Sequence, residues 1–144
     1  MVSKASSGTD KAAIVALDQA ALARYVPDLQ NWPASWRFED EDIPPGQALV
    51  QVFTPFLQHL LAQGYARKTL NRHRDYLWML GGEMIRRRHE DPDVLAMPVV
   101  TLLHNLLEED GGPLIWPRIS ESEQNSFDAT CRKLYHYLNQ SPNA

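Results

Sequence analysis

The stretch that decides the fold runs from Gly64 to Glu90 and reads GYARKTLNRHRDYLWMLGGEMIRRRHE. It holds seven of the chain's fourteen basic residues, namely Arg67, Lys68, Arg72, Arg74, Arg86, Arg87 and Arg88. Apolar residues recur between them at helical spacing, which predicts an amphipathic helix that begins near Thr69 and ends before Pro92. The cations therefore lie at the two ends of one helix with an apolar middle.

Two adjacent glycines, Gly81 and Gly82, lie inside this predicted helix. Each costs about 1 kcal/mol relative to alanine in a helix interior. We therefore expect either a close crossing with another helix at this point or a break that divides the segment into two helices.

The segment before the basic stretch, residues 47–63, has an apolar stripe typical of a helix that is buried on one side. Gly64 supplies a left-handed stop at its end. Pro55 lies inside the segment, where proline removes an amide and clashes with the preceding turn. We expect either a kink there or a helix that starts near Thr54, with Pro55 in its first turn.

Residues 28–46 show no helical period. They contain Trp32, Trp36 and an acidic run, EDED, at residues 39–42. The tryptophans are predicted to anchor a long connection on the core while the acids face water. The alternative is a regulatory or partner-binding loop whose acids face the basic stretch.

Three further helices complete the predicted fold. They are expected at about residues 11–25, from Pro98 to the stop at Gly111-Gly112-Pro113, and from a capping box at residues 120–123 to about Leu138. No strand alternation is present, so the prediction is an all-α protein, a compact bundle of about five helices with proline-rich connections. It would form a single domain over residues 10–139, between flexible ends at 1–9 and 140–144.

The overall composition and charge of the chain limit the classes of function that it can have. The chain has 144 residues and a net charge of -4, which argues against coating nucleic acid indiscriminately. Seven cations against two carboxylates give residues 67–89 a charge of +5, so the rest of the chain carries -9. No apolar run approaches the ~20 residues of a membrane span, and no signal-peptide core is present. The expected location is the cytoplasm, without a membrane partner.

No catalytic or metal-binding motif is recognisable. The five histidines are scattered without metal-ligand spacing, and His73 is expected to be a satisfied core residue. Cys131, the only cysteine, is followed by Arg132 and Lys133, whose charges favour a thiolate, but it belongs to an apolar stripe and is expected to be a small buried hydrophobe. We therefore predict no enzymatic activity, no cofactor and no metal, with an enzyme using Cys131 or a histidine as a third alternative.

The basic stretch carries the main functional hypothesis, which is DNA binding. Arginine forks match phosphate oxygens, and a helix start adds amides that favour an anion. Cations there oppose the helix dipole unless an anion is bound. The predicted DNA-binding residues are Arg67, Lys68, Thr69, Arg72, Arg74, Arg86, Arg87 and Arg88. Two alternatives remain open: a protein-interaction module whose basic helix binds an acidic partner, and a plain solvated helix.

Residues 56–77, FLQHLLAQGYARKTLNRHRDYL, carry a family resemblance. Over about residues 56–80 the chain resembles the N-terminal core-binding, SAM-like domain of phage-integrase-type tyrosine recombinases. The matching positions are Leu60, Gly64, Thr69, Leu70 and Leu77. The resemblance implies a small helical bundle whose turn at 65–69 faces DNA phosphates, in a recombination or mobile-element accessory role. The family's catalytic residues have no counterpart in the chain, so recombinase chemistry is not implied.

Overall fold

A computed structural model describes residues 7–140 of the chain. Residues 1–6 and 141–144 lie outside the described part, so the predicted flexible ends at 1–9 and 140–144 fall largely outside it. Helix begins already at Ser7, before the predicted start of the domain.

The described residues form an all-α fold, as predicted, but with seven α-helices rather than five. The helices are α1 (Ser7–Tyr25), α2 (Trp32–Trp36), α3 (Ile43–Ala62), α4 (Arg67–Arg88), α5 (Pro92–Leu95), α6 (Val99–Leu106) and α7 (Glu121–Leu138). Two short 3₁₀ helices, Leu29–Asn31 and Asp40–Asp42, flank α2. The two extra helices, α2 and α5, have five and four residues. They are too short to show a 3.6-residue period, which is why the sequence pattern missed them.

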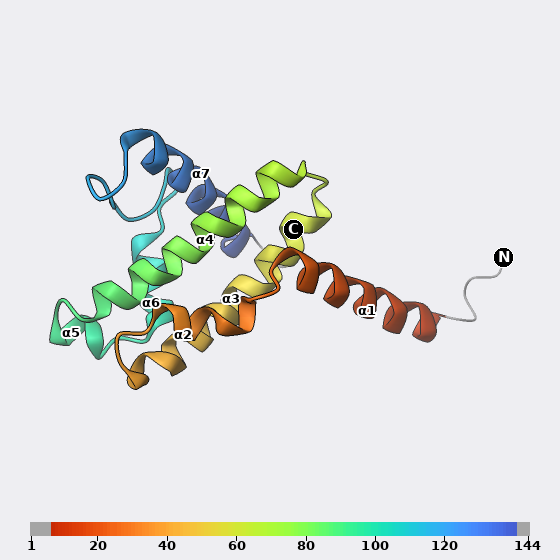
Figure 1. The fold of residues 1–144 in the computed structure, drawn as a ribbon, viewed down its shortest axis with the longest axis horizontal. Coiled ribbons are helices and arrows are strands. Elements are labelled where there is room, and N and C mark those ends of the chain that lie inside the picture. The colour runs from red at the N-terminus through yellow and green to blue at the C-terminus, as the bar shows by residue number, and fades with distance from the viewer. Residues whose placement is uncertain (1–6, 141–144) are drawn as a thin grey trace.

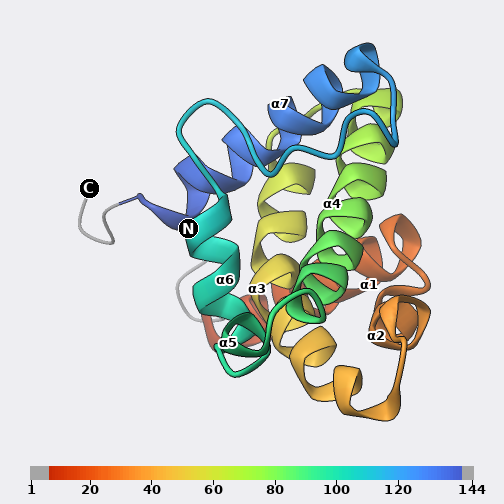
Figure 2. The same ribbon diagram turned by 90° about the vertical axis from the view of Figure 1, so that its left-hand side faces the viewer.

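Helices α3 and α4 form the centre of the fold (Figures 1 and 2). Helix α3 contacts α1, α2 and α6, while α4 contacts α2, α5, α6 and α7. Helix α1 extends away from the bundle (Figure 1), so Leu17 is 68% exposed whereas Tyr25 at its end is buried. The docking of α1 therefore depends on its last turns, next to the start of α4.

Helix α3 is continuous, and the prediction of a helix that starts near Thr54 is wrong. It begins at Ile43, with Pro44 and Pro45 in the first turn, where no intrahelical amide bond is lost. Pro55 lies inside the helix on an exposed position. Phe53 and Phe56, on either side of it, are fully buried, so apolar packing on one face outweighs the lost backbone hydrogen bond.

Helix α4 follows a tight turn at Gly64, which has the predicted left-handed conformation with φ of 76°. The helix begins at Arg67 with Ala66 as its N-cap, two residues before the predicted start near Thr69. It continues without a break through Gly81 and Gly82. A Cβ on Gly81 would lie 2.2 Å from Cζ2 of Trp36, so the glycine permits the close crossing of α2 over α4.

His73 is a buried core residue, as predicted, and is 4% exposed. Its Nδ1 lies 2.7 Å from the hydroxyl oxygen of Thr130 on α7. Burial, with smaller effects from Lys133 and Arg72, lowers the pKa of His73 from 6.5 to about 4. The uncharged imidazole therefore belongs to the folded state and links α4 to α7.

This burial predicts a pH dependence of stability. Because the pKa of His73 is lowered on folding, its contribution to stability is complete above pH 6.5 and is lost progressively as the pH falls towards about 4. An NMR titration of the His73 ring is expected to give a midpoint near 4. A midpoint at or above 6.5 would contradict the buried, neutral assignment.

No helix in the described part of the chain is long and apolar enough to cross a membrane.

Candidate nucleic-acid interface

Six of the eight predicted DNA-binding residues divide into two groups with different environments. Of the other two, Arg74 forms an ion pair with Asp75 at 2.9 Å, and Thr69 is half-buried in the first turn of α4. Arg86, Arg87 and Arg88, in the last turn of α4, are held by carboxylates of the protein itself. Arg67, Lys68 and Arg72, in the first turns, are exposed, and within residues 7–140 no carboxylate lies within ion-pairing distance of them. The structure thus does not bring the eight predicted residues together into one surface.

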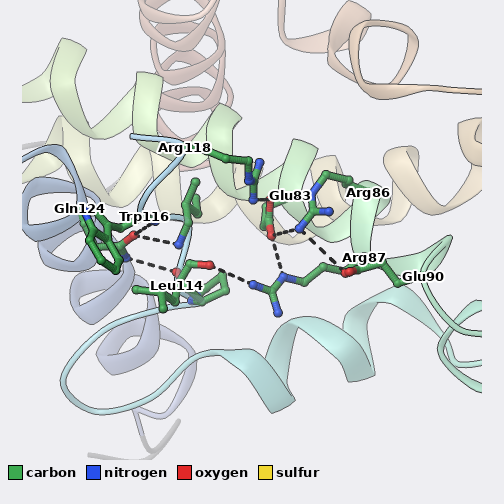
Figure 3. A network of polar contacts seen from close by, with 10 residues as sticks. Glu83, Arg86, Arg87, Glu90, Leu114, Trp116, Arg118 and Gln124 are labelled. Atoms are coloured by element: carbon green, nitrogen blue, oxygen red, sulfur yellow. Dashed lines mark hydrogen bonds and ion pairs between the residues drawn. The ribbon is translucent and has the colours of Figure 1, made fainter. Parts of the chain in front are cut away.

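Arg86 and Arg87 converge on Glu83, one turn earlier on the same helix (Figure 3). Arg86 donates to both carboxylate oxygens, from Nε at 3.1 Å and from Nη2 at 2.9 Å. Arg87 donates from Nε at 2.6 Å. A third guanidinium, that of Arg118, donates to the same carboxylate from Nη2 at 2.8 Å. Glu83 is 4% exposed, so these cations neutralise a buried charge.

The pKa of Glu83 reflects this cluster. Burial by itself would raise the pKa, but the hydrogen bonds from Arg86, Arg118 and Arg87 outweigh it and lower the value to about 2. The carboxylate therefore stays ionised throughout the physiological range. Two of the three predicted DNA-binding arginines at the end of α4, Arg86 and Arg87, are consequently structural.

Arg88 pairs with the acidic run, and the prediction that all four acids face water is wrong for one of them. Asp42 is 1% exposed, and its Oδ1 accepts from Nη1 of Arg88 at 3.1 Å and from Nε2 of His89 at 2.8 Å. Its Oδ2 accepts from the backbone amides of Phe38 and Glu39. The acidic loop therefore lies against the end of α4 and leaves the start of the helix uncovered.

Within residues 7–140, one group of side chains has the proximity for metal binding: Glu39, Asp42 and His89. Both oxygens of Asp42 already accept two hydrogen bonds each, and the guanidinium of Arg88 occupies the same place as a cation would. The geometry is thus that of an internal ion pair.

Cys131 is 1% exposed, and burial raises the pKa of its thiol strongly. A Cβ on Gly112 would lie 2.5 Å from its sulfur, so the loop packs directly on it. The surroundings do not favour a thiolate, in spite of Arg132 and Lys133 beside it in the sequence. Nothing around the Cys131 thiol therefore supports the alternative that it acts as a nucleophile.

The first turn of α4 has the features of an anion site. No side chain caps the helix, and its first backbone hydrogen bond runs from the amide of Leu70 to the carbonyl of Ala66. The amides of Arg67, Lys68 and Thr69 therefore point out of the helix end without intrahelical acceptors. The exposed side chains of Arg67 and Lys68 stand beside these amides.

The last turn of α1 contributes a cation that sequence reasoning missed. Arg24 of α1, together with Arg67 and Arg74 of α4, lines a hollow of about 350 Å³. The hydroxyl of Tyr25 donates to the carbonyl of Leu70, and Nη1 of Arg74 donates to the carbonyl of Tyr25 at 3.1 Å. These bonds fix the end of α1 against the start of α4. No local pattern in the sequence indicates that these two helix ends meet.

Fold and site together define an all-helical protein with a basic, uncapped helix start on its surface. Comparisons with protein-family models, curated protein sequences and solved structures give no match for this chain.

Proposed function

We propose that the chain is a non-catalytic DNA-binding protein that contacts the phosphate backbone through the start of α4. The observation that carries the proposal is the division of the cations on α4. Those at its end are neutralised internally, whereas Arg67, Lys68 and Arg72 remain exposed beside uncapped amides. Arg24 and Arg74 extend the same face across a hollow.

The physical case rests on the cost of this arrangement without a ligand. Two cations in the first turn, Arg67 and Lys68, oppose the helix dipole, which disfavours them by a few tenths of a kcal/mol each. A phosphate at the helix start would reverse the sign of that interaction and accept hydrogen bonds from the free amides. The protein's net charge of -4 restricts DNA to this face, because most of the remaining surface repels it.

The integrase-like resemblance over residues 56–80 points to the same turn and helix start. A role as an accessory in recombination or of a mobile element, in the cytoplasm, is part of the proposal and depends on that resemblance.

The test is a fluorescence-anisotropy titration of a labelled DNA duplex. For wild type, affinity is expected to fall between about 50 and about 200 mM salt, with a log–log slope near 0.9 per phosphate contacted. Replacing Arg72 with alanine is expected to weaken binding to all sequences alike and to reduce the slope by about 1.

Arg37→Ala is the matched control, because it removes another exposed arginine, one that lies near Gly82, Glu83 and Arg86 rather than near the start of α4, and gives the same net charge. Its affinity is expected to stay at the wild-type value. Absence of binding at low salt, or equal losses in the two variants, would refute the proposal.

The competing proposal is that the same face binds an acidic protein. Polyglutamate distinguishes the two: binding that depends on Arg72, in a chain that does not bind the duplex, would favour the acidic partner.

A further inference from the structure

A second surface, remote from the α4 start, carries a separate inference. A hollow of about 390 Å³ lies between the residues after α2, the middle of α4 and the loop at 113–119. Phe38 and Trp78 line it and are 68% and 43% exposed. Met79 and Ile119, both half-buried, add aliphatic surface, while Ile115 lines the hollow but is only 4% exposed. Single exposed apolar side chains are ordinary, but two aromatic rings gathered on one concavity are characteristic of an interaction site.

The walls of this hollow are fixed by hydrogen bonds. The indole Nε1 of Trp78 donates to the hydroxyl of Ser35 at 2.9 Å, and that of Trp36 donates to the carbonyl of Trp78 at 3.0 Å. The polar group of Trp78 is therefore satisfied, which leaves its apolar ring surface for a ligand. Little ordering is needed on binding, and such preorganisation favours affinity.

The loop that forms the other wall is also held in place (Figure 3). Oε1 of Gln124 accepts from the backbone amides of Ile115 and Trp116, at 2.8 and 2.9 Å. Nη2 of Arg87 donates to the carbonyl of Leu114 at 3.0 Å. The loop is thus tied to α7 on one side and to the arginine cluster of α4 on the other.

The charge of the hollow is positive, although the chain as a whole is acidic. Arg37, Arg86 and Arg118 line it together with one carboxylate, Glu83. With the ion-pair partners Asp40 and Glu90, and with Arg87 as a further cation on Glu83, four arginines face three carboxylates and the formal charge is +1. The side chains of Arg37 and Arg118 are about half exposed. Arg118 gives one of its five N–H donors to Glu83, so most of its fork is free for a second carboxylate.

We propose that this hollow binds an acidic amphipathic segment of a partner protein, with apolar side chains on Phe38 and Trp78 and carboxylates on the arginines at the rim. The charge complementarity selects the acidic partner, and tryptophan and arginine together are the residue types that dominate protein-binding hot spots. The aliphatic lining from Met79 and Ile119 favours protein side chains over nucleobases, which stack on aromatic faces. The inference does not depend on DNA binding, because it uses a different surface.

The test is a selection from displayed random peptides of ~15 residues, about four helical turns, on the wild-type protein. Enriched peptides are expected to be acidic, with large apolar residues three or four positions apart. Affinities are then measured by anisotropy. Phe38→Ala and Arg118→Ala are each expected to weaken binding by about tenfold. Phe38 is 68% exposed, so its replacement should leave the fold intact, whereas Arg118 is about half exposed and also donates to Glu83. Thermal unfolding therefore checks that each variant retains the fold.

Leu95→Ala, which shortens a 43%-exposed leucine outside the hollow, is the control and should bind like wild type. Enrichment without an acidic bias, or equal affinity in the Phe38 variant, would overturn the proposal. Two other results would also overturn it. Binding of single-stranded oligothymidine that depends on Trp78 would assign the hollow to nucleic acid. Self-association that Phe38→Ala abolishes would assign it to a second copy of the chain.

Discussion

Replacing Glu83 with glutamine is expected to lower the free energy of unfolding by about 3 kcal/mol. Removing one member of a buried ion pair typically costs 3–5 kcal/mol, because the remaining charge is left without compensation. The lower end applies here, since Arg86, Arg87 and Arg118 are 26–51% exposed and can turn partly to water. Urea denaturation followed by circular dichroism measures the change.

Glu90→Gln is the matched control. Its carboxylate also pairs with Arg86, but at 3.8 Å and with 56% exposure, so the loss is expected to stay within about 0.5 kcal/mol. Equal effects of the two substitutions would show that the arginine cluster does not stabilise the fold.

The Glu83 variant also has a distinct pH profile. Because folding lowers the pKa of Glu83 from 4.5 to about 2, the carboxylate's contribution is complete above pH 4.5 and is lost as the pH falls towards 2. The Glu83→Gln variant has no such carboxylate. The difference in the free energy of unfolding between wild type and variant is therefore expected to shrink as the pH falls from 4.5 towards about 2.

Replacing Gly81 with alanine is the second large expected effect, a destabilisation of about 2 kcal/mol. The new methyl would lie 2.2–2.7 Å from three ring atoms of Trp36, whose indole is fixed by its bond to the carbonyl of Trp78. Overpacking of this kind costs about 1–3 kcal/mol, and the upper end applies to a rigid neighbour. The higher helix propensity of alanine offsets about 1 kcal/mol of this destabilisation.

Gly82→Ala provides the control on the next residue of the same helix. Its Cβ would lie 3.4 Å from Cδ1 of Trp36, an ordinary contact, so the propensity gain should stabilise the protein by up to about 1 kcal/mol. The two alanine variants are therefore expected to differ by about 3 kcal/mol with opposite signs. A similar effect at both positions would mean that α2 does not cross α4 as described.

The periodic helices were predictable because each carries a stripe long enough to define its face. The continuity of α3 was not predictable. Proline normally disrupts a helix interior, but here the burial of Phe53 and Phe56 on one side of the helix outweighs the effect of Pro55. A close approach at Gly81 was foreseeable from composition, but its partner Trp36 lies 45 positions earlier and nothing local pairs them.

The candidate site was predictable only at the start of α4. Glu83 lies three and four residues before Arg86 and Arg87, a helical spacing that favours internal pairing, but both arginines were predicted as DNA contacts without regard to it. Asp42, by contrast, belongs to a run of four acids, and only the fold buries that one. Arg24 reaches the site through the docking of α1, which depends on long-range contacts that no periodicity records.

In the proposed function, the start of α4, and not its end, meets the DNA backbone. The most direct measurement is an NMR titration of the ¹⁵N-labelled protein with a short duplex, which reports the amides that change on binding. We expect the changes at residues 66–72 and at Arg24, with residues 83–88 unaffected. Changes confined to residues 83–88 or to the Trp78 hollow, or no changes at low salt, would contradict it.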